Sequence, residues 1–281
     1  MSKMLLPDIR LDERVVIMTW ADRGLGRIMA LGLAEASATV VLASPALQSL
    51  KAVASEIEAS GMGKAITCFV DITDPNPCRA LVRETTTKTG RLDVLVNNAR
   101  RMHVGPRLPP GGNSLPIYET DPEIYRETVT VNVIGTFFMT RAAAEHFLGQ
   151  GRGKIINITT SVRHFYRKHE SPYGVTKAGL EASPQIWARD LEGKNISVNS
   201  LLPGGSTDTD PNRQGKPGEV LLAGDIMNPL LIWLASTQSD GVTGCRFVGN
   251  KWDSLLPPVQ AAQAARQEPV FRDQPLGTFA L

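Results

Sequence analysis

The sequence predicts one α/β domain in which a doubly wound parallel sheet carries helices on both faces. Short apolar runs, each of a length typical of a buried strand, alternate with longer segments of helical character. Strands that are apolar throughout are buried on both faces, as in parallel sheets that are covered by helices. The order of strand and helix is that of a βαβ series, and 281 residues are enough to bury a sizeable core.

The predicted strands and helices follow one another along most of the chain. The strands are residues 15–19, 39–43, 65–70, 94–97, 154–159, 197–202 and 245–248. The segments between them that are long enough for crossover helices include residues 26–36, 45–60, 75–89 and 122–148. Together they predict a single domain over residues 1–253. A tail over residues 254–281 would be either loose or docked on a neighbouring subunit.

Two stretches that interrupt this alternation are predicted to be loops. Residues 100–120 are rich in proline and glycine, and residues 204–218 are rich in glycine, proline, aspartate and threonine. Each stretch follows a strand, and the ligands of open parallel sheets bind beyond the carboxyl ends of the strands. We therefore expect both loops to shape a substrate pocket, with the apolar helix after Asp225 as its lid.

The composition excludes several functions. The formal net charge is +2, from 30 basic and 28 acidic residues, which gives no electrostatic basis for binding nucleic acid. The three cysteines lack CxxC spacing and the four histidines lack metal-ligand spacing, so neither disulfides nor a metal site are predicted. No apolar stretch suits a signal peptide or a membrane span. These observations predict a cytoplasmic protein.

A glycine-rich turn follows the first predicted strand. Residues 19–26 read T-W-A-D-R-G-L-G, and the N-terminus of the helix that follows offers its N–H groups to phosphate. Further polar motifs fall at other strand ends or on helices facing them: N-N-A at 97–99, Asn132, Ser161, Y-G-V-T-K at 173–177 and P-G-G at 203–205. Tyr173 and Lys177, four residues apart, share one helix face.

In order, spacing and residue type, these motifs resemble those of the short-chain dehydrogenase/reductase family over residues 15–253. The resemblance implies a Rossmann fold and an NADP or NAD cofactor. It implies hydride transfer that interconverts a carbonyl and a secondary alcohol on a small-molecule substrate. It also implies a homodimer or homotetramer, with helices near residues 122–148 and 172–192 at the interface.

The resemblance implies a role for each catalytic residue. Tyr173 would be the general acid and base, and Lys177 would favour its phenolate and bond the nicotinamide ribose. Ser161 would hold the substrate oxygen near Tyr173, with Thr160 as the competing hydroxyl. Asn132 would steady Lys177 through a water, unless it only bridges two structural elements.

The resemblance also implies a nucleotide site at the strand ends. Asp71 and Ile72 would lie at the adenine, Asn98 and Ala99 at the adenosine ribose, and Pro203 and Gly204 near the nicotinamide. The other residues implied to bind the cofactor are Thr19, Trp20, Arg23, Gly24, Leu25, Gly26, Ser44, Arg100, Tyr173, Lys177 and Thr207, with Thr209 as the alternative to Thr207.

Two residues depart from the family pattern. Trp20 stands in place of the first glycine of the turn, and a bulky residue forced to positive φ costs roughly 1–2 kcal/mol. Arg100 stands where the family usually has glycine, and its guanidinium would either hinder the cofactor or pair with a phosphate. No carboxylate ends the second strand, and Arg23 and Ser44 would serve a 2′-phosphate, which favours NADP over NAD.

Two other functions stay open on the sequence alone. Trp20 and Arg100 would suit a relative that binds no cofactor and acts as a binding or regulatory protein, whereas the full set of Ser161, Tyr173, Lys177 and Asn132 argues against it. A lyase or epimerase without net redox chemistry is the third hypothesis, because this architecture hosts many functions.

Overall fold

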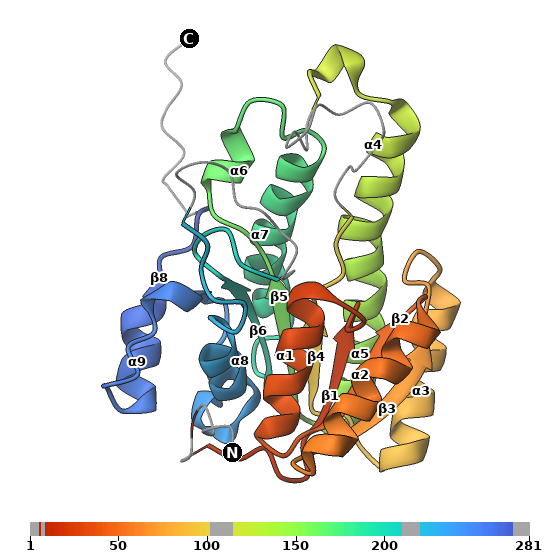
Figure 1. Cartoon of the computed structure of the whole chain (residues 1–281), viewed down its shortest axis with the longest axis vertical. Helices are drawn as coiled ribbons and strands as arrows, with labels where there is room; N and C mark the ends of the chain where they lie inside the picture. The colour runs from red at the N-terminus through yellow and green to blue at the C-terminus, as the bar shows by residue number, and fades with distance from the viewer. Residues whose placement is uncertain (1–5, 7–8, 102–114, 210–219, 272–281) are drawn as a thin grey trace.

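A central sheet organises the molecule (Figure 1). The computed structural model describes residues 6, 9–101, 115–209 and 220–271. Its strands are β1 (Val15–Thr19), β2 (Thr39–Ser44), β3 (Lys64–Phe69), β4 (Val94–Asn97), β5 (Gly153–Ile158), β6 (Ile196–Leu202), β7 (Arg246–Val248) and β8 (Arg266–Gln267). Their order is β3-β2-β1-β4-β5-β6-β7-β8. The neighbours from β3 to β7 are parallel, as predicted, and β8 pairs antiparallel with β7.

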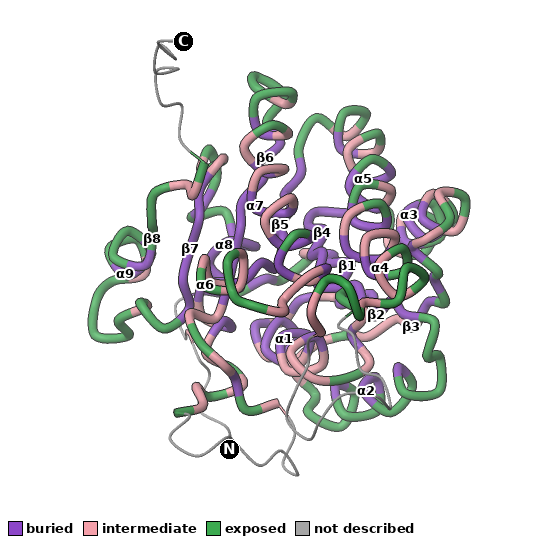
Figure 2. The backbone as a smooth tube through the Cα atoms, turned by 90° about the horizontal axis from the view of Figure 1, so that it is seen from above, coloured by how far each residue is buried: buried purple, intermediate pink, exposed green. Residues whose placement is uncertain are grey.

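Helices cover both faces of this sheet. The helices α1 (Gly24–Glu35), α2 (Leu47–Ser60) and α8 (Asn228–Ala235) form one buried cluster with alternate strand residues such as Met18. The helices α3 (Pro75–Thr89), α5 (Thr136–Gln150) and α7 (Tyr173–Asp190) form the second cluster, with residues such as Ile17. Figure 2 shows the strands as a buried band between helices with exposed outer faces. The predicted doubly wound fold is confirmed.

Local sequence signals set several helix ends. Asp74 and Asp121 each cap a helix that opens with proline, α3 and α4 (Pro122–Val129), by accepting a backbone N–H at 2.8 Å. Gly61 and Gly90 end α2 and α3 with φ values of 67° and 77°, a left-handed conformation that glycine adopts at little cost.

The single helix predicted over residues 122–148 is wrong in one respect. The segment consists of α4, a π-helical turn (Thr130–Gly135) and α5. Asn132 lies in the π turn, where its side chain bonds the backbone of Arg101. The apolar periodicity of the segment does not reveal this extra residue in the turn, and such turns are frequent at functional sites.

The helix after Asp225 is not a lid. This helix, α8, packs against α1, and its residues are buried along nearly the whole length. A helix that is apolar on all sides is more stable when other elements cover it than when it faces water. The lid prediction therefore fails because the segment belongs to the core.

The first part of the predicted tail is folded onto its own chain. Residues 258–267 form α9 (Pro258–Ala265) and β8, neither of which was expected. Ala261, Ala262 and Ala265 are buried, and β8 pairs with Arg246 and Phe247 of β7. This part is packed on its own chain, and residues 272–281 lie outside the described residues.

Other expectations fall only partly within the structure. Residues 102–114 and 210–219, which make up most of the two predicted loops, lie outside the described residues. In the part of the chain that is described, no helix is long and apolar enough to cross a membrane. The same part contains no cluster of three or more His, Cys, Asp or Glu side chains that would hold a metal ion.

Candidate active site

The predicted site residues gather at the carboxyl end of the sheet. β1 and β4 are neighbours although β2 and β3 lie between them in the sequence, so the strand order reverses direction at this point. Such a reversal leaves a crevice outside the strand ends. The glycine-rich turn follows β1, Asn98 follows β4, Ser161 lies beyond β5, and Pro203 follows β6.

Tyr173 and Lys177 lie one turn apart at the start of α7. Lys177 Nζ is 6.0 Å from the centre of the Tyr173 ring and donates a hydrogen bond of 2.9 Å to the Ile158 carbonyl at the end of β5. Only 2% of Lys177 is exposed. Burial and, to a smaller extent, the charge of Arg100 lower the pKa of Lys177 to about 7, and Glu181 opposes this shift. Lys177 therefore exchanges a proton near neutral pH.

Asn132 connects three segments of the site. Its Oδ1 accepts the Arg101 N–H at 2.6 Å, and its Nδ2 donates to the Arg101 carbonyl and to Thr176 Oγ1, both at 3.0 Å. The Thr176 hydroxyl in turn donates to the Tyr173 carbonyl at 2.8 Å. The amide thus joins the end of β4 and the π turn to the helix that carries Tyr173 and Lys177.

The two candidate hydroxyls after β5 differ in accessibility. Thr160 is 9% exposed, and its carbonyl accepts a hydrogen bond of 3.4 Å from Arg246 Nη2. Ser161 is partly exposed, and its carbonyl accepts the His164 N–H at 3.0 Å, which begins the turn of α6 (Arg163–Tyr166). A substrate reaches a partly exposed hydroxyl more easily, which supports Ser161 over Thr160.

His164 is a neighbour of Tyr173 that the sequence analysis did not single out. Its ring meets that of Tyr173 edge to face, with centroids 6.1 Å apart. A Cβ on Gly174 would lie 2.2 Å from the His164 carbonyl oxygen, so glycine lets α6 approach α7 beside Tyr173. The glycine that follows Tyr173 was the sequence signal for this close approach.

The glycine-rich turn keeps its left-handed geometry despite Trp20. Trp20 has a φ of 51°, and its N–H donates to the Ala43 carbonyl at 2.7 Å. A Cβ on Gly26 would lie 2.0 Å from the Trp20 carbonyl oxygen, so only glycine fits where α1 meets the turn. Non-glycine residues rarely adopt this φ, and the predicted backbone strain at Trp20 is present.

Thr19 and Asn98 hold the ends of β1 and β4 together. Thr19 Oγ1 accepts the N–H groups of Asn98 and Ala99 at 2.9 and 3.0 Å. The Asn98 amide donates to the Thr19 and Trp20 carbonyls at 3.0 and 3.1 Å. These bonds fix the floor of the crevice through backbone atoms, and all of the residues involved were predicted to be site residues.

The start of α1 fits a pyrophosphate. Gly24 has a φ of 56°, and a Cβ placed on it would meet no atom within 4 Å. Arg23 occupies the N-cap position, and its side chain forms no capping hydrogen bond with the first N–H groups of the helix. Leu25 packs against the first buried cluster. Uncapped N–H groups beside open space form a suitable anion site.

The Trp20 side chain lies on the adenosine side of the crevice. The Trp20 side chain packs against the second buried cluster, which contains Ile72 and Ala99. Asp71 Oδ1 accepts the N–H and hydroxyl of Thr73 at 2.9 and 2.7 Å, while its residue stays exposed. The indole therefore lies on the side of the sheet to which the resemblance assigned the adenosine.

The residues that were expected to bind phosphate groups, Arg23, Arg100 and Ser44, differ in exposure and in their contacts. The Arg23 side chain is 81% exposed at the start of α1. Arg100 is exposed too, and its charge acts on the buried Lys177. Ser44 is 2% exposed, and its hydroxyl accepts the Ala46 N–H at 3.0 Å. Arg100 thus stands within electrostatic reach of the catalytic group.

The end of β6 is held by Asn250. Gly204 has a φ of 93°, and a Cβ on it would lie 2.3 Å from Asn250 Oδ1. The Asn250 N–H donates to the Pro203 carbonyl at 3.0 Å. Thr207 is 7% exposed and forms a bridge with Leu222. Pro203, Gly204 and Thr207 therefore line the same end of the sheet as the catalytic group.

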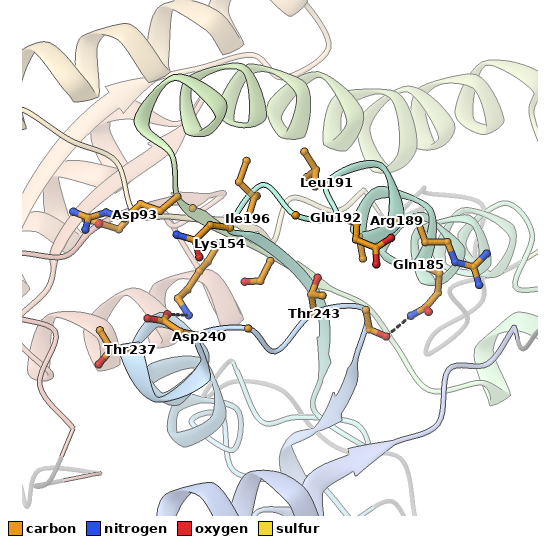
Figure 3. Close-up of a pocket in the computed structure, with 18 of the residues that line it drawn as sticks. Asp93, Lys154, Gln185, Arg189, Leu191, Glu192, Ile196, Thr237, Asp240 and Thr243 are labelled. Carbon is orange, nitrogen blue, oxygen red and sulfur yellow. Dashed lines mark hydrogen bonds and ion pairs between the residues drawn. The ribbon is translucent and has the colours of Figure 1, made fainter.

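A cavity of about 650 Å³ lies at the opposite end of the sheet (Figure 3). Its lining comes from the starts of β5 and β6, the end of α7 and the turn before β7. Lys154 Nζ pairs there with Asp240 at 2.7 Å and donates to Ser239 Oγ at 2.9 Å. No predicted site residue lines this cavity, so it is distinct from the crevice.

Comparison with known proteins shows which family the chain resembles. A family model described as short chain dehydrogenase matches residues 14–219. A 3-oxoacyl-(acyl-carrier-protein) reductase of Thermotoga maritima is 28% identical over 253 residues, which cover 84% of this chain and 96% of the relative.

Solved structures are similar over most of the chain. A gluconate 5-dehydrogenase of Burkholderia cenocepacia, in complex with NADP and tartrate, has a TM-score of 0.74 and 28% identity and covers 85% of this chain and 94% of its own. A 7α-hydroxysteroid dehydrogenase complexed with NADH and 7-oxoglycochenodeoxycholic acid has a TM-score of 0.72 and 27% identity, with 85% and 93% covered.

Proposed function

The chain belongs to the short-chain dehydrogenase/reductase family and is an NAD(P)-dependent oxidoreductase, and we propose that Tyr173, Lys177, Ser161 and Asn132 carry its chemistry. The reaction interconverts a carbonyl and a secondary alcohol on a small-molecule substrate. The comparisons support this reading and not that of a cofactor-free binding protein.

One observation carries the assignment of residues. The Lys177 ammonium is buried one turn from Tyr173 and is anchored on the Ile158 carbonyl at 2.9 Å. A fixed cation beside a phenol favours its phenolate, which is the form that takes a proton from an alcohol. In the direction of reduction, Tyr173 gives the proton to the developing alkoxide.

Ser161 would position the substrate, and Asn132 would position the helix that carries Tyr173 and Lys177. The partly exposed hydroxyl of Ser161 would donate to the substrate oxygen and hold it at the Tyr173 phenol. Asn132 would keep α7 in register with the end of β4, through Thr176 and the backbone of Arg101. His164 would limit the orientation of the Tyr173 ring by its edge-to-face contact.

The cofactor would occupy the crevice with its phosphates at the start of α1. The nicotinamide supplies or accepts the hydride when it is bound. The uncapped N–H groups around Gly24 would bind the pyrophosphate, and Lys177 would bond the nicotinamide ribose. Thr19, Asn98, Ala99, Asp71 and Ile72 would line the adenosine end, and Pro203, Gly204 and Thr207 the nicotinamide end.

We further propose that NADP is preferred over NAD. Arg23 carries an exposed guanidinium at the start of α1, Arg100 is exposed after β4, and β2 ends in Ser44 without a carboxylate. Trp20 is expected to weaken the binding of either nucleotide without abolishing it, because its indole occupies space on the adenosine side.

An oligomer is also proposed. Exposed apolar side chains lie on α5 and α7, among them Phe137 at 44%, Val175 at 53% and Ile186 at 57% exposure. A monomer rarely exposes so much apolar surface on neighbouring helices. We expect these helices to meet their counterparts in a homodimer or homotetramer, which light scattering on the eluting protein measures.

The experiment that tests the function is a titration of the purified protein with NADPH and NADH, followed by nucleotide fluorescence. Saturable binding of at least one nucleotide is expected, with NADPH the tighter, and the bound nucleotide then serves in a screen of ketones and secondary alcohols. Absence of binding up to millimolar nucleotide, with a folded circular dichroism spectrum, would contradict the proposal.

A further inference from the structure

A buried ion pair lies directly behind the catalytic group. Arg246 Nε of β7 and Glu181 Oε1 of α7 are 2.8 Å apart, and the two side chains are 5% and 2% exposed. Glu181 is one helical turn beyond Lys177, on the same face of α7. Neither residue belongs to the motifs that define the site, and the sequence analysis found neither.

Arg246 joins three segments through one guanidinium group. Besides its ion pair with Glu181, Arg246 donates hydrogen bonds to the Thr160 carbonyl at 3.4 Å and to the Gln267 side chain on β8. Thr160 directly precedes Ser161, while the Ile158 carbonyl two residues earlier accepts the bond from Lys177. The exit of β5, which carries Ser161, is therefore held by both Lys177 and Arg246.

The charges around Lys177 are opposed. Arg100, beyond β4, lowers the pKa of Lys177, whereas Glu181, on its own helix, raises it. Tyr173 is the remaining titratable side chain one turn away on α7. Burial raises the pKa of Glu181, and Arg246, Thr159 and Lys177 all favour its charged form. Arg246 thus helps to keep a negative charge behind the lysine.

We propose that the Glu181–Arg246 pair is a positioning device for the reaction: Glu181 places a negative charge one turn from Lys177 and favours its ammonium form, and Arg246 fixes the segment that presents Ser161. The inference rests on the proposed roles of Lys177 and Ser161. Its two halves are separable, because Glu181 acts through charge and Arg246 through the fork of donors on Thr160 and Gln267.

The charge half is tested with the double variant Glu181→Leu/Arg246→Met. Removing both partners avoids an unpaired buried charge, so the variant is expected to fold with a Tm close to that of the parent. The side-chain resonance of Lys177 is followed in ¹⁵N-lysine-labelled protein without nucleotide, assigned by its loss in Lys177→Met. We expect the titration of Lys177 to move to lower pH.

Kinetics give the second readout. With the parent pKa of Lys177 at about 7, a fall of about one unit halves the charged fraction at pH 6 and lowers it about tenfold at pH 8. The loss of kcat/KM in the double variant should therefore be larger at pH 8 than at pH 6. A loss of equal size at both pH values, with the Lys177 titration unmoved, would reduce the pair to a structural role and overturn this half.

The positioning half is tested with Arg246→Lys, which keeps the charge on Glu181 paired but cannot reach Thr160 and Gln267 together. We expect kcat to fall about tenfold or more with the Lys177 titration unchanged, because Ser161 loses its support. A parental kcat would overturn this half. Lys154→Met, which removes a buried lysine at the other end of the sheet, is the matched control and should leave the Lys177 titration in place.

The test also separates the inference from the function on which it rests. The resonance of Lys177 is measured without nucleotide or substrate. If the parent protein showed no turnover, the proposed function would fail, while a shifted Lys177 titration in the double variant would still support the electrostatic role of Glu181.

Discussion

The two halves of the crevice are built on different principles. The catalytic half, at the start of α7 and the exit of β5, depends on side-chain atoms: the Tyr173 phenol, the Lys177 ammonium and the amide of Asn132. The nucleotide half, around β1 and α1, depends on backbone N–H groups and close approach at Gly24 and Gly26. The unusual residues, Trp20 and Arg100, occur in the nucleotide half or at its border.

This difference teaches where a chain of this fold tolerates change. Replacing a catalytic side chain removes a group that no neighbour supplies, so the chemistry is lost. A bulky residue in the turn leaves the backbone N–H groups in place and costs strain and space, as the φ of 51° at Trp20 shows. Substitutions in the catalytic half of the crevice should change kcat, and those in the nucleotide half should change nucleotide affinity.

The largest effect is expected for Tyr173→Phe. Loss of the hydroxyl removes the proton donor and acceptor, and kcat should fall about 10²–10⁴-fold. The dissociation constant of NADPH should stay within about twofold, because the phosphate site at α1 is untouched. Single-turnover kinetics and a fluorescence titration measure the two quantities. A matching loss of affinity would show that the two halves are not separable.

Lys177→Met should stabilise the protein while it removes activity. Burial depresses the pKa of Lys177 in the folded state from 10.5 to about 7, so the unfolded chain binds the proton more tightly. The resulting penalty is full below pH 7 and fades as the pH rises towards 10.5. We expect a gain of about 2 kcal/mol in urea unfolding at pH 6, shrinking towards pH 10. A variant less stable than the parent at pH 6 would contradict the stated cause.

Trp20→Gly should tighten nucleotide binding. The change relieves roughly 1–2 kcal/mol of left-handed strain and clears space on the adenosine side, so the dissociation constant of NADPH should fall several-fold. Trp187→Ala removes another indole that packs on the same cluster, but from α7, and serves as the control. If Trp20→Gly binds NADPH no more tightly than the parent does, the indole is not the obstacle.

The smallest effect is expected for Arg100→Gly. Removing this charge should raise the pKa of Lys177, because Arg100 repels the ammonium form. NADPH affinity should fall a few-fold if the guanidinium pairs with a phosphate and rise if it hinders entry, and calorimetry distinguishes the two hypotheses. Arg101→Gly, next in the chain and paired with Glu127 at 2.5 Å, is the control, and its Lys177 titration should match that of the parent.

Much of the fold followed from the sequence because its signals are local. Seven apolar runs became seven parallel strands, and no predicted bound differs from the observed one by more than one residue. Asp74 and Asp121 before proline mark helix starts through their own side chains. The π turn at Asn132 and the burial of α8 were missed because both arise from tertiary packing, which apolar periodicity does not report.

The site divided in the same way. The motif residues were found because their spacing reflects strand ends that the sheet brings together. Glu181 and Arg246 were missed because they lie 65 positions apart in the sequence and meet only because α7 packs on β6, the strand beside β7. His164 was missed because its contact with Tyr173 depends on how α6 folds back over Gly174.

The short strand β8 affects how the edges of the sheet can pair with other molecules. An edge strand has unpaired backbone N–H and C=O groups, so a strand of another molecule can pair with it and extend the sheet. Arg266 and Gln267 pair with β7, and Arg246 supports this pairing through its bond to the Gln267 side chain. Within the described residues the opposite border, β3, stays uncovered, with Phe69 59% exposed on it. β8 is itself the outer strand on its side of the sheet, but its two residues offer a neighbouring chain far less backbone than the six residues of β3 do.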